Sequence, residues 1–576
     1  MPRRPLLAIA LLAATLHGVG IARSALPAQD GLKFLRVARD FPRKPWADVV
    51  RSSDQHPLYP AVVALAQPIV ATIAGDGAES WRIAAQVVSA LASLATLIPL
   101  YWLTRSLFDS AKATMACLLF VLLPLPAELG HETLSDSLAL FLFASTMAFG
   151  VRVGKAPTPF HSSHLDCTSV VLNRVPVVVP DQCPRNVTGE HWSGTTNGTQ
   201  RTHSRETGWA RVAITTGFLS GLGYLTRPEL AIAPIAIVLT LLIQSLRGWS
   251  RTLELRRTHF SQMATISVGF LFLVGSYALV KGEVSEKLAL RRSIAVGSTH
   301  DQAARTIRPL PAGLDDPRWD FSAKEESAAP GSIGLSKATI LLFSKWCESL
   351  GVLLVPLAFF GMWRARYRPF GLLMPIYGCV FSLILIRHAA TFGYLSSRHV
   401  LSLMLVSLPF AASAILDLVR AVRVWREKRS PGSVDRMRFV RILAVGAMIA
   451  FGLGVQFHRP PHQTRWGHNQ AGLWLKENAN EASTVLDTRG WANFVSGRPG
   501  HDYWHVRQAL TDPHLGYIVV GSDELSASSK RAETLRAVLA YAGELAVTFP
   551  ERQGGRSLDV QVYRFHPPDN WKGMTP

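Results

Sequence analysis

Long apolar runs recur along this 576-residue chain, and short polar segments separate them. A membrane-spanning helix needs about 20 predominantly apolar residues, and most of the runs approach that length. The pattern therefore predicts an all-α polytopic membrane protein with about 11 transmembrane helices. The expected spans are 5–25, 81–103, 113–129, 134–151, 209–225, 230–246, 263–280, 338–362, 370–386, 400–418 and a last one that ends near 457.

Two apolar runs allow more than one interpretation. Residues 58–74 contain two prolines and fit either a short span or a helix that lies in the membrane interface. If this helix lies flat, Arg105 and Lys112 fall on the cytoplasmic side, as the positive-inside rule requires, and we expect that arrangement. The first run, 5–25, precedes small residues as a cleaved signal peptide does, but it is longer than a usual signal core.

The pattern changes after residue 457. Segments 482–486 and 516–520 are typical of short buried strands, 558–565 alternates like a strand, and 469–478 and 531–545 have helical spacing. We therefore expect a small C-terminal α/β domain. The predicted organisation is a transmembrane domain over 1–457, with a first outer loop 26–80, an inner disordered insertion 152–208 and an outer loop 281–337. A soluble extracytoplasmic domain over 458–576 follows it.

The charge supports a membrane location. The chain carries 60 Lys and Arg against 40 Asp and Glu, a net charge of +20. In a soluble protein this excess would suggest nucleic-acid binding. Here the basic residues cluster in short loops between apolar runs, and on the predicted topology these loops share one side. We therefore expect a lipid bilayer and no nucleic acid as partner. The expected location is the bacterial inner (plasma) membrane, with a cytoplasmic N-terminus and an extracytoplasmic C-terminal domain.

On this topology, polar side chains collect at the outer ends of the spans. A carboxylate close to the membrane is costly to desolvate, so Asp30, just after the first span, is the candidate general base. A guanidinium group matches the oxygens of a phosphate in a two-point fork, so arginines on this face suit an activated sugar. The candidate substrate-binding residues are Asp54, His56, Glu132, Asp136, Arg227, Glu229, Arg398 and His399.

Simpler alternatives exist for several of these residues. Asp30 would suit the N-cap of a helix over 32–41, and Glu132 and Asp136 could cap the span that follows them. His56 precedes a proline and fits ordinary turn chemistry.

A simpler structural role fits one of the two candidate arginines but not the other. Arg398 and His399 could anchor at lipid headgroups, but Arg227 lies in a turn between two apolar helices and must find a partner or water. No phosphate-binding loop, dinucleotide glycine pattern, zinc-ligand spacing or nucleophile elbow is present. The sequence thus indicates no cofactor and no metal, although it leaves a divalent metal open, and the energy source should be the donor's own phosphate ester.

These residues resemble the glycosyltransferase C superfamily, and most of all the branch of protein O-mannosyltransferases and lipid A aminoarabinose transferases. The resemblance extends to the span that ends near 418. Asp30 with Phe34 and Ala38 is similar to the family's first outer loop, in which an Asp-Glu pair leads a helix, but Gly31 replaces the usual Glu. Further similar segments are 55–59 (Pro-Pro-Leu-Tyr in the family), 75–82, the Thr-Arg turn in 221–229, and 397–399, which resembles a late motif near the lipid phosphate.

The resemblance implies an inverting hexosyl- or pentosyltransferase whose active site faces away from the cytoplasm. Its donor would be a polyprenyl-phosphate sugar and its acceptor a lipid, a glycan or a protein. Asp30 would be the base, and Arg227 and Arg398 would hold phosphate. The alternative is a transporter or flippase of lipid-linked sugars, which would favour internal repeats and charges near mid-membrane. The polar residues instead lie at the ends of spans, which favours the enzyme.

Overall fold

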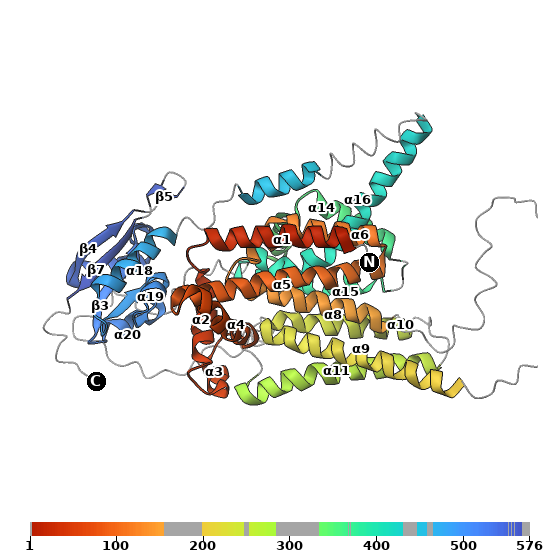
Figure 1. The fold of residues 1–576 in the computed structure, drawn as a ribbon, viewed down its shortest axis with the longest axis horizontal. Coiled ribbons are helices and arrows are strands. Elements are labelled where there is room, and N and C mark those ends of the chain that lie inside the picture. Colours follow the sequence, from red (N-terminus) through yellow and green to blue (C-terminus); the bar gives the residue numbers. More distant parts are fainter. Residues whose placement is uncertain are drawn as a thin grey trace, which may run out of the picture.

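The protein consists of a bundle of long helices with a small sheet domain at one end (Figure 1). The computed structural model describes residues 3–154, 198–246, 253–283, 333–366, 368, 370–429, 446–457, 465–550, 552–553, 556–557 and 559–566. Within the predicted insertion and the long outer loop, residues 155–197 and 284–332 lie outside the described residues. The N-terminus lies at the end of the bundle that is remote from the sheet domain (Figure 1).

The bundle helices follow the apolar runs. They are α1 (Arg3–Arg23), α5 (Ala78–Leu107), α6 (Ser110–Leu122), α8 (Asp136–Gly154), α9 (Gly198–Thr226), α10 (Ile232–Leu246), α11 (Leu253–Lys281), α13 (Leu335–Leu350), α14 (Leu354–Ala365), α15 (Leu373–Phe392), α16 (Leu401–Arg429) and a short helix Gly446–Phe457. Among the described residues, seven helices are long and apolar enough to cross a membrane, or eight if the bent pair α13 and α14 counts as one. The other three predicted spans correspond to α6, α9 and Gly446–Phe457. The fold class is confirmed: this is a polytopic helical membrane protein.

Shorter helices lie at the end of the bundle nearer the sheet domain. They are α2 (Gln29–Asp40), α3 (Trp46–Ser52), α4 (Leu58–Ala74) and α7 (Pro124–Leu129). Figure 1 shows α2 and α3 running across the ends of the long helices. Helix α4 buries Tyr59 and Val63 but exposes Leu65, Ile69 and Ile73 at a spacing of four residues. An apolar stripe on one side of a short helix suits a position in the membrane interface, which remains the prediction for α4.

The sheet domain begins with α18 (Trp466–Asn478) and holds a five-stranded sheet of order β2-β1-β3-β7-β4. Strands β2, β1 and β3 are parallel, and β7 is antiparallel to both β3 and β4. The strands are β1 (Thr484–Asp487), β2 (Gly500–His501), β3 (Leu515–Gly521), β4 (Gly543–Phe549) and β7 (Val560–Phe565); β5 (Arg552–Gln553) and β6 (Arg556–Ser557) form a separate ribbon. The predicted helix 531–545 is α22 (Lys530–Ala542), and it ends where Gly543 begins β4.

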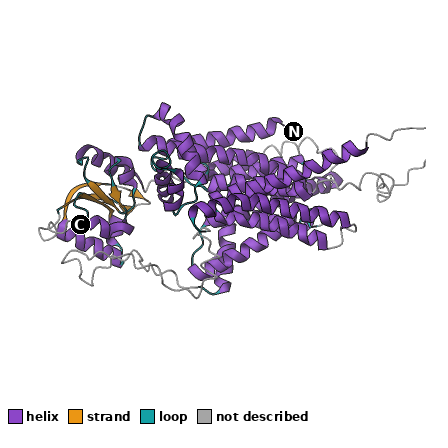
Figure 2. Ribbon diagram, turned by 90° about the horizontal axis from the view of Figure 1, so that it is seen from below, coloured by secondary structure: helices purple, strands orange, loops and turns teal. Residues whose placement is uncertain are grey.

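Helices cover both faces of the sheet (Figure 2). One hydrophobic cluster joins α22 and α20 (Val506–Leu510) to the sheet, and another joins α18 and α19 (Trp491–Ser496) to its other face. Two side chains of α19, Trp491 and Phe494, instead belong to the hydrophobic core of the bundle. The two parts of the protein therefore share a packed interface.

Helices α9 and α11 cross closely at two glycines. A Cβ atom on Gly217 would lie 2.3 Å from the carbonyl oxygen of Ile266, and one on Gly269 would lie 2.9 Å from that of Ile214. Small residues allow such contact between helices inside a membrane, where the hydrophobic effect does not drive association. These two glycines thus set the spacing of the two helices.

We expect Gly217→Leu to lower the apparent melting temperature of the detergent-solubilised protein, because the added side chain must push the helices apart. Overpacking of this kind costs about 1–3 kcal/mol. Gly275→Leu on α11 is the matched control, since a Cβ there meets nothing within 4 Å. Equal melting temperatures for the two variants would show that the crossing does not depend on Gly217.

The sheet domain should be sensitive to acid through His468 on α18. Burial lowers the pKa of His468 to about 4, and Arg489 adds to this effect, whereas Glu524 and Asp523 oppose it. The unfolded chain binds a proton more readily at this position, so the contribution to stability is complete above about pH 6.5 and is lost as the pH falls toward 4. The full effect is on the order of 3 kcal/mol.

We therefore expect His468→Gln to flatten the fall in melting temperature between about pH 7 and pH 4.5. The comparison is His566→Gln, because the His566 side chain is 64% exposed. An unchanged slope in His468→Gln would assign the acid sensitivity to other groups.

Candidate active site

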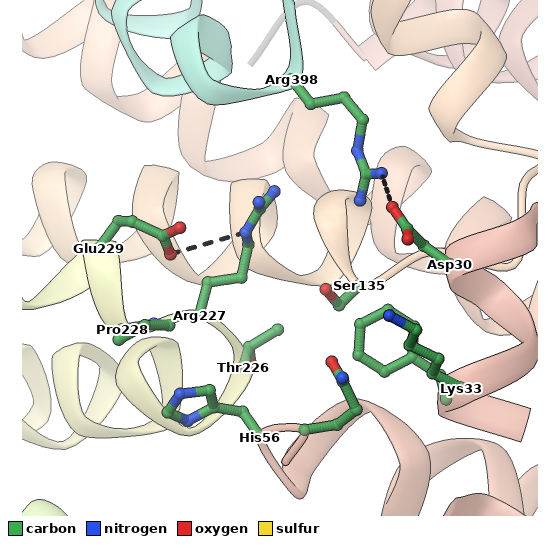
Figure 3. Close-up of a pocket in the computed structure, with 11 residues that line it drawn as sticks. Asp30, Lys33, His56, Ser135, Thr226, Arg227, Pro228, Glu229 and Arg398 are labelled. Carbon is green, nitrogen blue, oxygen red and sulfur yellow. Dashed lines mark hydrogen bonds and ion pairs between the residues drawn. The ribbon is translucent and has the colours of Figure 1, made fainter. Parts of the chain in front are cut away.

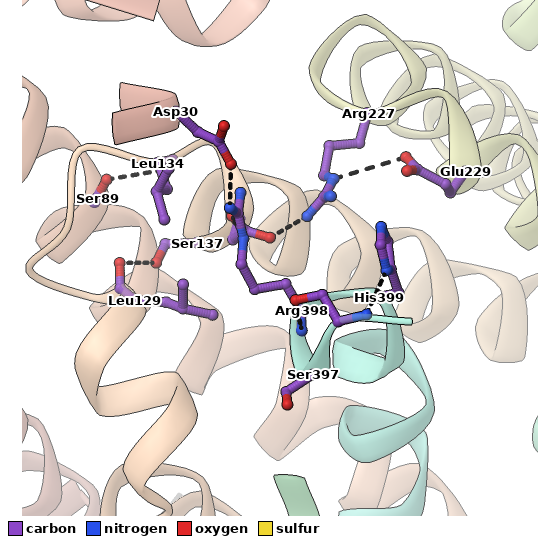
Figure 4. Close-up of polar contacts among 12 residues, drawn as sticks. Asp30, Ser89, Leu129, Leu134, Ser137, Arg227, Glu229, Ser397, Arg398 and His399 are labelled. Atoms are coloured by element: carbon purple, nitrogen blue, oxygen red, sulfur yellow. Dashed lines mark hydrogen bonds and ion pairs between the residues drawn. The ribbon is translucent and has the colours of Figure 1, made fainter. Parts of the chain in front are cut away.

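The site is built around a buried carboxylate at the start of α8. The side chain of Asp136 is 0% exposed, and its two oxygens pair with two arginines from distant parts of the chain. Figure 4 shows these arginines, Arg227 and Arg398, approaching each other from different elements. Oδ1 accepts a hydrogen bond from Nη1 of Arg227. Oδ2 accepts from Nε and Nη2 of Arg398, at 3.1 and 2.7 Å. Both oxygens of Asp136 are therefore engaged in salt bridges, and the carboxylate orients the two arginines.

Local sequence explains how both arginines reach this point. Arg227 precedes Pro228, and a residue before proline is disfavoured in the helical region. Helix α9 accordingly ends at Thr226, and Arg227 is extended ahead of the 3-10 turn η1 (Pro228–Ala231). Arg398 lies on another 3-10 turn, η2 (Ser397–Val400), which Ser396 and His399 close with a capping box. Both turns leave the arginine side chain free to extend toward α8.

Asp30 lies in the first turn of α2 and joins the same network. Its Oδ2 accepts a hydrogen bond of 2.8 Å from Nη1 of Arg398. The N-cap of α2 is Ala28, with no side-chain cap, so the structure does not support the alternative of Asp30 as an N-cap. Its side chain is 60% exposed, in contrast to Asp136, so Asp30 is the more weakly held of the two carboxylates on Arg398.

Gly31 packs against the loop that leads into α8. A Cβ atom at this position would lie 1.9 Å from Oγ1 of Thr133. The same hydroxyl accepts a hydrogen bond of 3.1 Å from the backbone nitrogen of Ala28. Any side chain at 31 would therefore displace α2 from the loop that leads into α8.

A polar cavity of about 190 Å³ lies beside this network (Figure 3). It is lined by Asp30, Lys33, Phe34, Gln55, His56, Ser135, Thr226, Arg227, Pro228, Glu229 and Arg398. Lys33 and Phe34 were not among the predicted site residues. They follow Asp30 by three and four residues, so the helical spacing of α2 was the signal that could have found them.

His56 is held against the wall of the polar cavity by aromatic rings. Its imidazole stacks on Tyr277 at 5.7 Å between ring centroids and meets Tyr224 edge-on at 5.5 Å. Lys281 secures the preceding segment by donating to the carbonyl oxygens of Arg51 and Ser53, at 2.9 and 2.8 Å. The position of His56 therefore depends on the end of α11.

A second, smaller cavity of about 40 Å³ lies on the other side of the arginines. Its polar lining is Asp136, Arg227, Glu229, Arg398, His399 and Ser402, and its apolar lining comes from Ala139, Leu140, Leu230, Phe381, Leu385 and Leu401. Arg227 and Arg398 thus form the boundary between a polar cavity and a largely apolar one. Nε of Arg227 lies 3.7 Å from Oε2 of Glu229, which borders both cavities.

Two predicted substrate-binding residues lie elsewhere. Asp54 is exposed and lines neither cavity. Glu132 is 2% exposed, and its Oε1 lies 3.8 Å from Nη1 of Arg465, at the start of the sheet domain.

His399 lines the second cavity only, and its Nδ1 accepts a hydrogen bond of 3.1 Å from the backbone nitrogen of Ser396. The structure thus brings Asp30, His56, Asp136, Arg227, Glu229, Arg398 and His399 around the two cavities.

The arrangement combines anion binding with proton transfer. Two guanidinium groups and the Lys33 ammonium could hold a phosphate ester, and the outer oxygen of Asp30 could accept a proton within the same cavity. Among the described residues, no three His, Cys, Asp or Glu side chains are grouped so that they could hold a metal ion.

This chain is similar to known proteins in its three-dimensional structure, and not at the level of sequence families. No protein-family model matches the sequence, and no curated protein matches it either. Among solved structures, the chain is similar to the oligosaccharyltransferase AglB from Archaeoglobus fulgidus, solved with an inhibitory peptide and a dolichol-phosphate. The TM-score is 0.52 at 14% identity, and the match covers 100% of this chain and 74% of that one.

The chain is also similar to ArnT from Cupriavidus metallidurans. For the structure bound to undecaprenyl phosphate, the TM-score is 0.53 at 12% identity, over 97% of this chain and 98% of that one. For the apo structure, the TM-score is 0.51 at 13% identity, over 96% and 97%. AglB and ArnT are both members of the glycosyltransferase C superfamily. The chain therefore shares its overall fold with AglB and ArnT, as the resemblance led us to expect.

Proposed function

We propose that the protein is a membrane glycosyltransferase that moves a hexose or pentose from a polyprenyl-phosphate donor to a hydroxyl of a lipid, glycan or protein. One observation carries the proposal: Asp30 faces the same cavity as two arginines that a buried carboxylate holds in place. The fold adds support, because ArnT and AglB were solved with undecaprenyl phosphate and with a dolichol-phosphate.

The donor phosphate would bind at Arg227 and Arg398. These groups keep their orientation through Asp136, so they need no rearrangement before they meet an anion. The apolar cavity behind them would take the first part of the lipid chain, and the polar cavity would take the sugar. Lys33, which has no salt-bridge partner among the described residues, would add a third positive charge from α2.

Asp30 would act as the general base. The acceptor oxygen attacks the anomeric carbon and gives its proton to Asp30, while the bond from that carbon to the phosphate oxygen breaks and polyprenyl phosphate leaves as an anion. Before the donor binds, Asp30 shares Arg398 with Asp136. A donor phosphate would compete for the same guanidinium, and the exposed Asp30 would be displaced before the buried Asp136. Donor binding would thus free the base.

This proposal includes a cellular orientation. Helix α2, which lines the polar cavity, lies at the end of the bundle nearer the sheet domain, and the N-terminus lies at the other end (Figure 1). With the basic loops in the cytoplasm, the site and the sheet domain would face the non-cytoplasmic side of a bacterial inner membrane.

We expect Asp30→Asn to reduce kcat by about 10²- to 10⁴-fold, the usual contribution of a general base, with donor binding retained. The measurement uses purified protein with a panel of labelled polyprenyl-phosphate sugars and scores transfer and donor binding separately. Asp40→Asn on the same helix is the matched control, because Asp40 pairs with Lys44 outside both cavities. Undiminished transfer by Asp30→Asn would reject Asp30 as the base.

We expect Arg398→Lys to raise the KM for the donor about tenfold or more, because an ammonium cannot form the forked contacts of a guanidinium. The same substitution at Arg364 is the control, since Arg364 pairs with Asp417 and lines neither cavity. Donor KM values that are equal in the two variants would place the phosphate elsewhere.

A further inference from the structure

The sheet domain contacts Leu26 and Pro27, which a single residue, Ala28, separates from the start of α2. The indole nitrogen of Trp491 donates a hydrogen bond of 2.9 Å to the carbonyl oxygen of Pro27. Nη1 of Arg465 donates to the carbonyl oxygen of Leu26 at 3.2 Å. The bonded backbone lies three and four residues before Asp30, so the sheet domain holds the segment from which the candidate base projects.

The same two side chains form one cluster. The guanidinium of Arg465 lies 5.4 Å from the centre of the Trp491 ring, within the range of a cation–π contact. Arg465 is also the salt-bridge partner of Glu132, which is buried. Glu132 precedes Thr133, whose hydroxyl accepts from Ala28 and packs on Gly31. Arg465 thus contacts both segments that lead to the site, one into α2 and one into α8.

The side of α2 that faces away from the polar cavity contacts the sheet domain along most of its length. Gly490 approaches Leu32 and Arg36, and Arg36 pairs with Asp502 at 3.2 Å. Arg39 lies over the ring of Phe494 at 4.6 Å. At about 100° per residue, positions 32, 36 and 39 fall on the side of the helix opposite to 30, 33 and 34. The sheet domain therefore packs on one side of α2 while the other side lines the polar cavity.

We infer that Arg465 and Trp491 are positioning residues: the sheet domain fixes α2 so that Asp30 stays at the edge of the cavity beside Arg398. This inference rests on the proposed function, because it gives the domain a role in placing the base. It assigns the domain a task in the transfer step itself, separate from acceptor contact. Neither residue lines either cavity, so both act through α2.

The central test is Trp491→Phe, which keeps an aromatic ring in the interface and removes the hydrogen bond to Pro27. We expect kcat to fall about tenfold or more, as small misplacement of a catalytic group commonly causes. The donor KM should stay within about twofold, because Arg227, Arg398 and Asp136 keep their contacts. Trp474→Phe is the matched control, since Trp474 packs on Tyr517 within the sheet domain.

A double-mutant comparison separates positioning from general loss of structure. If Trp491 acts through the base, Trp491→Phe should cause no further loss of rate in an Asp30→Asn background. Equal fold-losses in both backgrounds, or an unchanged kcat in Trp491→Phe alone, would overturn the inference.

A measurement without activity keeps this test apart from the proposed function. In a background in which the five native cysteines are replaced by alanine, a nitroxide spin label attached to Asp30→Cys should become more mobile when Trp491→Phe is added. The mobility should not change with Trp474→Phe. Increased mobility in a protein that transfers no sugar would reject the function and leave the positioning intact. Transfer that depends on Asp30, with label mobility and kcat unaffected by Trp491→Phe, would reject the positioning alone.

Discussion

The whole site depends on one buried carboxylate. Moving an ionised Asp136 out of water costs several kcal/mol, and only close, well-aligned cations offset that cost. Arg227 and Arg398 meet the requirement from segments 91 and 262 residues away in the sequence. Their salt bridges therefore fix the start of α8, the break between α9 and α10, and the turn before α16 relative to one another. The geometry that holds these helix ends together also fixes the orientation of the two guanidinium groups.

This arrangement also separates the environments on either side of the arginines. Polar groups of α2 and of the segment before α4 face one side, and leucines and a phenylalanine of α8, α15 and α16 face the other. A lipid-linked sugar has the same division, with an apolar chain, a charged phosphate and a polar ring in sequence. Asp136 keeps the arginines at the boundary between the two cavities, while the exposed Asp30 can give up its contact with Arg398. The salt-bridge network is therefore fixed at the buried Asp136 and can change partners at the exposed Asp30.

Hydropathy predicted the helices, because burial in lipid imposes a strong pattern on every span. Sequence signals failed where distant contacts or local backbone decide the outcome. The predicted span 338–362 is bent by 97° at Gly351, whose φ of +91° few other residues adopt. Glu132 was assigned to the site because it lies near Asp136 in sequence, yet its partner is Arg465 of another domain. The periodicity of apolar residues carries no information about such a partner. The same periodicity placed the end of the predicted helix 531–545 inside strand β4, because both segments are amphipathic.

Gly31 allows α2 to join the loop that leads into α8. Thr133 packs against the bare backbone of α2 at this position, and the same threonine binds Ala28. A glutamate at 31 and this close contact would exclude each other sterically. The missing side chain thus permits a direct junction between α2 and that loop. Contacts from the sheet domain on the opposite side of α2 complete that junction, so Asp30 is held from both sides although its own side chain remains exposed.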